Sequence, residues 1–598
     1  MNAPVKPPAE ALPQWGLEDL YAGREDPRIE VDIEAGAEIN GELAALKGAF
    51  VGARKEPAKL GELIDRGISL YQGATDKLWG VGAYAGLASS VARDDPAWAR
   101  FEGDIRTRSS QIAADSLFFT LELNELEDAD IAAALKAYPA AARWRPWLRR
   151  VRLSRPHELS QELERMLLDR GPAVANWVRL YDDTLASLVI RTGRESLTLA
   201  EALNRLSNSD PAKRKSAARG LARALEAKSG ALALAFNTLA FEKQVEDRWR
   251  RYPTPAAARH VANEVDAEAV EALEAAVVAS YPRLSHRYYA LKAKVMGKKR
   301  LDHWDRNAPL SAAPTRRYGW EQARTMVLES FEALAPRFAA AAGRFFDEPW
   351  IDAQPRAGKQ SGAYSHPVTS ERHPYVFLNF MGERRDVLTL AHELGHAVHQ
   401  TLAAPQGTLL ADTPLTLAET ASIFGEGLVF ERLLAEAKGL ERRDLLAGKI
   451  EDALNTVVRQ IAFHRFESRF HEARAKGELS TDEISDIWMT VMGESLGPAV
   501  RLNAGYETYW SYVSHFVHSP FYVYAYAFGN LLVEALMEAR RRNPEGFTPL
   551  YEDLLAAGGA RTYVEALAPF GLDPRDPAFW SGGCARLERL VDEFEALV

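Results

Sequence analysis

The residue pattern with the clearest chemical use is H-E-x-x-H, formed by His392, Glu393 and His396. The surrounding segment 386–400 carries apolar residues in the pattern of a buried helix. On such a helix the two histidines share one face about one turn apart, so both imidazoles can reach a single ion. Glu393 projects beside His392, where it can take a proton from a metal-activated water but is badly placed to be a ligand. The pattern therefore predicts a zinc site with its own general base.

A catalytic zinc usually has three protein ligands and one open position, so a third side chain must be supplied. The candidates that follow the motif are His399, Asp412, Glu419 and Glu426. His399 lies a further turn along the same helix face, which makes one tetrahedral ion hard to share among three histidines. The metzincin pattern fails, because its later Gly and His positions hold His399 and Leu402. An acidic ligand from a second helix is therefore favoured.

The segment 416–435 is predicted to be that second helix, with Glu419 and Glu426 seven residues apart on one face. Both carboxylates stand among apolar residues, where an unpaired charge is costly to bury and a metal compensates for it. We predict Glu419 as the third ligand and Glu426 as a hydrogen-bond partner of a ligating histidine. The alternative is that both glutamates are solvated.

A change of character before the motif indicates a small sheet. Residues 357–373 are rich in glycine and serine, and the run 374–380 is β-rich, which predicts a small antiparallel sheet beside the zinc helix. An edge strand in that place can bind an extended peptide through backbone hydrogen bonds. The alternative is a connecting hairpin without a part in binding.

A tyrosine-rich segment, 512–530, lies far downstream. If Pro520 is the first residue of a helix, Tyr522 and Tyr526 share a face and Tyr524 turns away. Such a stripe is ordinarily core or the wall of a binding site, so by itself it is only suggestive.

The composition excludes several classes of protein. With 598 residues, of which 47% are hydrophobic and 26% charged, the chain is typical of a soluble globular protein with two or three domains or one large cleft-bearing body. The net charge of -10 gives no basic field for nucleic acid. Cys584 is the only cysteine, so a metal must be held by nitrogen and oxygen. No apolar run has the length of a signal peptide or a membrane span, which predicts a cytoplasmic protein.

Most of the chain has the pattern of amphipathic helices. The one clear hairpin of the first third, 188–199, turns at Gly193 and indicates a boundary. The segment 301–310 lacks helical periodicity and is predicted to be a loop, with His303 a structural histidine. The predicted divisions are a mobile lead-in at 1–14, an N-terminal helical region at 15–200 and a catalytic helical metallopeptidase domain at 201–598.

Five motifs occur together along the chain: WGLEDLY at 15–21, SGAYS at 361–365, HELGH at 392–396, AETAS at 418–422 and HFVHSPFYVYAYA at 515–527. Together they resemble the oligoendopeptidase F branch of the thimet oligopeptidase family of zinc metallopeptidases. The resemblance extends from Trp15 to the GLDPRDPAFW at 571–580. This combination is far more specific than H-E-x-x-H alone.

The resemblance implies a mainly α fold, a two-lobed helical body with a deep central channel that admits short unstructured peptides and excludes folded proteins. The resemblance also implies that the ligands of one Zn2+ per chain are His392, His396 and Glu419. It also carries Glu393 over as the general base.

Downstream, the resemblance carries over His515 and Tyr522 as groups that contact the substrate and stabilise the tetrahedral intermediate. Tyrosine spacing differs between branches of the family, which leaves open whether Tyr522, Tyr524 or Tyr526 is catalytic. The tyrosines without that role are predicted to contact the substrate. His518 stands where relatives vary and is interpreted as structural.

The predicted function is therefore hydrolysis of internal peptide bonds in short oligopeptides, with oligopeptides as the only partners, no nucleic acid or membrane, and an open oligomeric state. Glu393 takes a proton from the attacking water and passes it to the leaving amine. The Gly362 and Ala363 backbone and the strand containing Tyr375 and Phe377 are predicted to align the substrate.

Two rival functions remain from the sequence. One is an exopeptidase, either a carboxypeptidase or a dipeptidyl carboxypeptidase, that uses the same zinc site. The other is a non-catalytic peptide-binding protein with a structural zinc, which an intact H-E-x-x-H disfavours because a structural site has no use for a general base.

Overall fold

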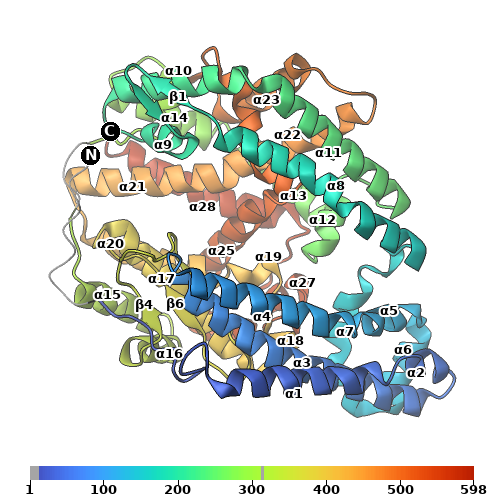
Figure 1. Cartoon of the computed structure of the whole chain (residues 1–598). Helices are drawn as coiled ribbons and strands as arrows, with labels where there is room; N and C mark the ends of the chain where they lie inside the picture. Colours follow the sequence, from blue (N-terminus) through green and yellow to red (C-terminus); the bar gives the residue numbers. More distant parts are fainter. Residues whose placement is uncertain (1–11, 312–315) are drawn as a thin grey trace. The chain divides into compact units, whose positions relative to one another are not determined.

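The structure, a computed structural model, describes residues 12–311 and 316–598. Helices make up most of it and the strands are short, which confirms the predicted mainly α fold (Figure 1). Contacts along the chain define two compact units, each assembled from three separate stretches. Unit 1 comprises Met1–Arg155, Thr315–Leu433 and Asn543–Gly571, and unit 2 comprises Pro156–Pro314, Leu434–Arg542 and Leu572–Val598.

The predicted lead-in at 1–14 lies mostly outside the described residues. Where description begins, Leu12 is buried, and the carbonyl of Pro13 accepts a hydrogen bond from the backbone N–H of Ala353. The predicted division at residue 200 and the predicted channel stay predictions.

The first helices of unit 1 lie side by side, and its later helices pack around the H-E-x-x-H helix, α17. Its helices are α1 (Pro27–Ala44), α2 (Ala49–Gly52), α3 (Pro57–Ser90), α4 (Pro96–Ala114), α5 (Leu117–Glu125), α6 (Asp128–Ala137), α7 (Arg145–Arg152), α15 (Trp320–Glu332), α16 (Pro336–Asp347), α17 (Arg384–Ala403), α18 (Thr408–Ala411), α19 (Leu415–Ala418), most of α20 (Ser422–Glu436), α26 (Pro544–Ala556) and α27 (Tyr563–Leu567). An aromatic and aliphatic core, with Phe50, Phe119 and Trp147 at its centre, joins the first of these helices.

The sheet of unit 1 is mixed rather than purely antiparallel. Its strands are β4 (Ile351–Asp352), β5 (Tyr364–His366) and β6 (Tyr375–Phe377), in the order β4-β6-β5. The pair β5–β6 is antiparallel, as predicted, whereas β4 adds a parallel strand that the sequence analysis did not anticipate. The central strand is therefore β6, and β5 is an edge strand.

The α17 helix confirms the predicted helix at 386–400 and shows why it forms there. A capping box between Glu383 and Asp386 closes its first turn and satisfies backbone N–H groups that have no partner inside the helix. Its apolar stripe, including Leu390 and Leu394, is fully buried. The helices α16 and α26 pack directly against it.

Unit 2 contains the tyrosine-rich segment and is also mainly helical. Its helices are α8 (Gln161–Ala186), α9 (Leu199–Arg205), α10 (Pro211–Glu226), α11 (Ser229–Trp249), α12 (Ala257–Ala262), α13 (Ala267–Ser280), α14 (Ser285–Val295), α21 (Gly439–Ala453), α22 (Arg459–Arg474), α23 (Thr481–Leu496), α24 (His515–His518), α25 (Tyr524–Arg542) and α28 (Pro577–Glu595). A π-helical turn, Leu454–Val458, joins α21 to α22. The helices α13 and α28 pack against α25.

The predicted hairpin is confirmed as β1 (Ile190–Thr192) and β2 (Glu195–Leu197), an antiparallel pair that turns at Gly193. The predicted loop at 301–310 is partly wrong. There, β3 (Leu301–Asp302) pairs in parallel with β7 (Val500–Arg501), and a 3-10 turn follows it. A two-residue strand is too short to leave a periodic pattern in the sequence.

Within the described residues, no helix combines the length and the apolar character that a membrane span requires.

Candidate active site

Three potential ligand atoms converge in unit 1. Across residues 12–311 and 316–598, His392, His396 and Glu419 form the single group whose ligand atoms all lie within 4.8 Å of one another. Oε2 of Glu419 lies 3.4 Å from Nε2 of His392 and 3.5 Å from Nε2 of His396. A tetrahedral zinc with bonds of about 2.0–2.1 Å sets its ligands about 3.3–3.4 Å apart. The donor set, two imidazole nitrogens and one carboxylate oxygen, therefore fits zinc in both chemistry and spacing.

Glu419 does not lie within a continuous helix. It reaches the histidines from a short turn between two helices. The predicted helix at 416–435 is wrong here, because α19 ends at Ala418 and α20 begins only at Ser422. One buried carbonyl of this turn is satisfied, since the hydroxyl of Tyr551 donates to the carbonyl of Thr420 at 3.1 Å. The Ser422 hydroxyl donates to Oε2 of Glu419 at 2.7 Å and so fixes the direction of the carboxylate.

Gly395, the glycine of HELGH, lets this turn approach α17. A Cβ atom at this position would lie 2.4 Å from the carbonyl oxygen of Ala421 and 2.7 Å from Cα of Ser422. Both contacts are with backbone, which cannot rotate out of the way. Only glycine allows the two segments to come this close.

Gly395→Ala is expected to push the 419–422 turn away from α17. We expect an overpacking cost of about 1–3 kcal/mol or more, together with weaker metal binding because Glu419 moves with the turn. Thermal denaturation and zinc content measure the two effects. The matched control is Gly86→Ala in α3, where an added Cβ meets nothing within 4 Å and alanine should be neutral or stabilising. Equal zinc content and equal Tm in Gly395→Ala and the parent protein would contradict the close-approach argument.

Glu426 lies on α20 beside His392. Its Oε2 is 3.5 Å from Nδ1 of His392, the ring nitrogen that faces away from Glu419. Burial lowers the pKa of His392, but the hydrogen bond that its ring donates to Glu426 and the charge of Glu419 outweigh that effect, so the pKa is raised. A hydrogen-bond acceptor beside Nδ1 keeps the proton of the neutral ring on Nδ1. The lone pair of Nε2 is then free to bind a metal ion.

His396 is kept neutral by its surroundings. Burial lowers its pKa to about 4, against the opposing effects of the Glu419 charge and of the hydrogen bond that the ring donates to the Ala418 backbone. The neutral imidazole is the form that binds a metal ion.

Glu393 is a buried carboxyl, 7% exposed, on the same helix. Burial raises its pKa to about 7, against the opposing effects of His392 and of a hydrogen bond from the Ser365 backbone N–H. A carboxyl with a pKa in this range can exchange protons in both directions near neutral pH, which is what a general base that later acts as an acid requires.

The edge strand β5 lies next to Glu393, because the Ser365 backbone contacts the Glu393 carboxyl and the Ser365 hydroxyl donates to Gln400 of α17 at 2.8 Å. Gly362 and Ala363 lead into β5. Gly362 is exposed, with a left-handed φ of 94°, and its carbonyl accepts from Asn379 at 3.2 Å.

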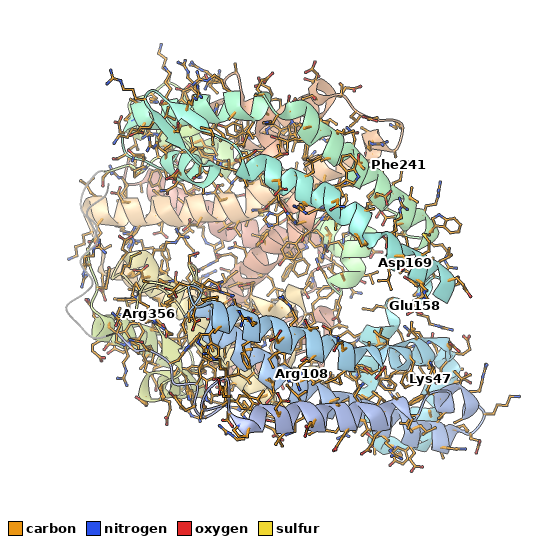
Figure 2. The ribbon with its side chains drawn as sticks, in the orientation of Figure 1. Lys47, Arg108, Glu158, Asp169, Phe241 and Arg356 are labelled. Carbon is orange, nitrogen blue, oxygen red and sulfur yellow. The ribbon has the colours of Figure 1, made fainter. Side chains whose placement is uncertain are left out.

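Buried ion pairs hold the loop that leads to β5. Lys359 lies 2.7 Å from Asp352 of β4 and also donates to the carbonyls of Gln354 and Leu378. Arg356 makes two further hydrogen bonds to Asp352 and is marked near the end of β4 in Figure 2.

The prediction that Tyr375 and Phe377 contact the substrate is wrong for this structure. Both side chains are fully buried, with Tyr375 bonded to Asp19 at 2.5 Å and Phe377 stacked on Tyr364. Their strand, β6, is paired on both sides, so its backbone has no free edge for a peptide. The edge that could accept a peptide is β5.

In unit 2 the tyrosine-rich segment folds differently from its prediction. Pro520 does not begin a helix, because Phe521 has a left-handed φ of 59° and α25 starts only at Tyr524. Tyr522 and Tyr526 nevertheless lie together, with their ring centroids 5.4 Å apart.

His515 joins these two rings. Its Nε2 lies 3.1 Å from the hydroxyl of Tyr526, and its ring is stacked with that of Tyr522 at 6.2 Å. The structure thus brings His515, Tyr522 and Tyr526 into one cluster within unit 2.

Tyr524 turns away from that cluster, as the sequence indicated. Its side chain is fully buried, and its hydroxyl is held by Asn263 at 2.9 Å and by the ring of His260 at 3.0 Å. The prediction that Tyr524 contacts substrate is therefore corrected, because a side chain without exposure cannot touch a peptide.

Three histidines for which the sequence favoured a role other than metal binding lie outside the metal cluster. His303 is buried and accepts a hydrogen bond from the Asn503 N–H at 3.2 Å, and His518 pairs with Asp182 at 2.8 Å. His399 is buried on α17, with its Nε2 3.5 Å from the Thr413 hydroxyl.

Sequence reasoning missed two residues that orient the site, Ser365 and Ser422. Both stand in motifs that the sequence displayed, SGAYS and AETAS. Glu393, the partner of Ser365, lies on another segment, so no spacing rule could identify Ser365. Ser422 stands three residues after Glu419 in the same motif, and that spacing was the signal that could have identified it.

Comparison with known proteins shows the family of the chain. The model of peptidase family M3 matches residues 205–585, and a model described as oligopeptidase F matches residues 122–189. The first match covers more than half of the chain, so the chain belongs to peptidase family M3, a family of metallopeptidases. The predicted oligoendopeptidase F branch is confirmed by both matches and by the relatives.

Oligopeptidase PepF of Bacillus subtilis is 24% identical to the chain, over 100% of the chain and 88% of that protein. The crystal structure of a candidate peptidase from Chlamydophila abortus superposes with a TM-score of 0.87 and 22% identity, covering 99% of this chain and 100% of that one. Oligoendopeptidase-F from Enterococcus faecium gives a TM-score of 0.70 and 20% identity, covering 95% and 99%. The two structures establish the fold, and the family establishes a peptidase of oligopeptides.

Proposed function

We propose that the protein is a zinc-dependent endopeptidase that hydrolyses internal bonds of short, unstructured oligopeptides. The observation that carries this proposal is the convergence of His392, His396 and Glu419 at zinc-ligand spacing. The buried Glu393 extends from the same helix, α17. A purely structural metal site has no need of such a carboxyl.

When bound, zinc supplies the Lewis acidity that makes a water molecule nucleophilic near neutral pH and polarises a scissile carbonyl. Glu393 takes the proton of the attacking water and delivers it to the leaving amine. Its raised pKa suits both transfers. Glu426 orients His392 through Nδ1, and Ser422 orients Glu419.

We further propose that His515 and Tyr522 donate hydrogen bonds to the carbonyl oxygen as negative charge develops on it. Within unit 2, Tyr522 and Tyr526 flank His515, and Tyr526 is 39% exposed, so it remains a candidate for substrate contact. The buried Tyr524 has no such role.

The substrate backbone is proposed to lie along β5, in continuation of Gly362 and Ala363. β5 is half-exposed and has no partner strand on one side, although the Ser365 backbone N–H bonds Glu393 and the Ser365 carbonyl accepts from Gln400 at 3.5 Å. Hydrogen bonds to the substrate backbone do not depend on the side chains of the substrate, which suits an enzyme that accepts varied peptides.

A mixed peptide library, half of it blocked at both ends, tests the proposal. We expect cleavage at internal bonds of free and blocked peptides, a length limit, and loss of all cleavage with a chelator followed by recovery on adding zinc. Mass spectrometry identifies the products. Cleavage restricted to peptides with a free C-terminus would instead identify a carboxypeptidase or dipeptidyl carboxypeptidase, and tight binding without products would identify a peptide-binding protein. A cytoplasmic location remains part of the proposal.

A further inference from the structure

Phe521 adopts a backbone conformation that a bulky residue rarely takes. Within the described residues it is one of three non-glycine positions with positive φ, alongside Arg251 and Glu264, and its φ is 59°. An aromatic side chain in this region is strained unless its surroundings hold it there. Tyr522 follows directly, so the direction of its side chain depends on this strained peptide.

Glu467 of α22 holds that peptide. Its Oε1 accepts a hydrogen bond from the Phe521 backbone N–H at 2.7 Å, and the residue is only 1% exposed. Its Oε2 has no hydrogen-bond partner among the described residues. Burial raises the pKa of the Glu467 carboxyl to about 8. Burying a carboxyl among apolar side chains costs free energy of folding. If Glu467 served only to fill space, an apolar side chain would do so at a lower cost.

Most side chains around Glu467 are aromatic or aliphatic, although the charges of Arg259 and Lys243 also act on its carboxyl. It lines a small cavity together with Phe466, Phe470, Phe516 and Val517. The Phe521 ring packs edge to face beside His464 and tilted against His471, at 5.8 and 5.0 Å between ring centroids. Among the described residues, no other side chain is recorded to accept the Phe521 N–H.

Two further contacts fix the chain on either side of Phe521. Nε of Arg259 donates to the carbonyl of Pro520 at 3.2 Å, and its guanidinium lies 5.6 Å from the centre of the Tyr522 ring. Beyond the turn, the buried hydroxyl of Tyr524 is held by Asn263. Because the residues on both sides of Phe521 are held by these contacts, we infer that the conformation of the Phe521 peptide sets the direction of the Tyr522 side chain.

We propose that Glu467 is a positioning residue, which locks the Phe521 peptide and thereby directs Tyr522 toward His515. This inference rests on the proposed function, in which Tyr522 contacts the reacting carbonyl. Glu467 itself does not touch the substrate. It acts through one backbone hydrogen bond, and its conservative replacement should therefore be tolerated.

The test compares Glu467→Met with Glu467→Gln. Methionine fills a similar volume without accepting the hydrogen bond, whereas glutamine keeps an oxygen acceptor without the carboxyl. We expect Glu467→Met to lower kcat by about 10- to 100-fold with little change in KM, because small misplacements of a catalytic group cost that much. Glu467→Gln should stay within about threefold of the parent enzyme, since the hydrogen bond is retained.

Binding of a phosphinic peptide, which mimics the tetrahedral intermediate, supplies a readout besides turnover. Its Ki should rise in Glu467→Met by about the factor by which kcat falls, because Tyr522 acts on the transition state and not on the ground state. Zinc content and Tm are measured on the same samples. Unchanged zinc content and folding would exclude a general structural defect.

A double-mutant cycle with Tyr522→Phe tests whether Glu467 acts through Tyr522. If it does, Glu467→Met should cost little once the Tyr522 hydroxyl is gone, whereas independent effects multiply. The control is Glu274→Gln, a half-buried carboxyl of α13 that faces Arg465 and His464 of α22 and makes no hydrogen bond to the Phe521 N–H. It should leave kcat unchanged.

The outcomes separate this inference from the proposed function. If Tyr522→Phe lowers kcat but Glu467→Met does not, or if the two effects multiply, the positioning role is overturned and the peptidase proposal stands. If Tyr522→Phe has no effect on an enzyme that is still zinc-dependent, the role of Tyr522 is wrong and the positioning role falls with it. Loss of activity in Glu467→Gln equal to that in Glu467→Met would also overturn it.

Discussion

Glu393→Gln is expected to lower kcat by about 10³- to 10⁴-fold while zinc remains bound. Glutamine has nearly the same size and can keep the hydrogen bond from the Ser365 backbone, so α17 should not move. It cannot accept the proton of the attacking water, and the leaving amine then departs without a proton donor. Single-turnover rates on a quenched peptide, together with zinc content, measure the effect.

The matched control for this experiment is Glu431→Gln, which removes an exposed carboxylate from α20. Its kcat should equal that of the parent enzyme. Hydrolysis by Glu393→Gln at the parental rate would show that another group acts as base and would remove the central step of the proposed mechanism. Loss of zinc from this variant would instead show that Glu393 supports the metal.

Glu419→Ala and Glu426→Ala are expected to separate a metal ligand from the group that orients one. Glu419 supplies the only carboxylate oxygen within the metal-ligand cluster, so its removal should strip most zinc during dialysis and abolish activity. Glu426 contacts the far nitrogen of His392, and its loss should weaken zinc affinity by about 10- to 100-fold and leave binding measurable.

Zinc titration with a competing chelator measures both variants on one scale. A rise in Tm on adding zinc should survive in Glu426→Ala and disappear in Glu419→Ala, because a ligand that binds only the folded state stabilises it. Full zinc occupancy in Glu419→Ala with loss in Glu426→Ala would reverse the two assignments. His399→Ala serves as the control for a buried histidine of α17 that faces Thr413.

Predictions from the sequence were correct where the residues of a single element determine the local structure. The α17 helix is such a case, because both its apolar stripe and its histidine spacing follow from a single helical period. The β1–β2 hairpin is another, since Gly193 marks the turn between two short runs. The orientation of Tyr524 away from Tyr522 and Tyr526 agrees with the prediction, although the helix from Pro520 on which that prediction depended does not form.

The errors occurred where a segment depends on a partner distant in sequence. The break at Glu419 carries no proline or glycine and exists because Tyr551 and Gly395 accommodate a buried turn. The start of α25 shifted from Pro520 to Tyr524 because Glu467, on another helix, holds Phe521 in a left-handed conformation. A sequence window contains none of these partners.

The amino-acid sequence by itself determined the helical class of this protein, the H-E-x-x-H helix and the family to which its motifs belong, because each follows from local periodicity or from residues close together in the chain. The tertiary structure decided which glutamate oxygen meets which histidine nitrogen, that β5 and not β6 is the free edge, and that Tyr524 is buried. Those features depend on how separate segments pack, and packing is set by close contacts between residues up to hundreds of positions apart.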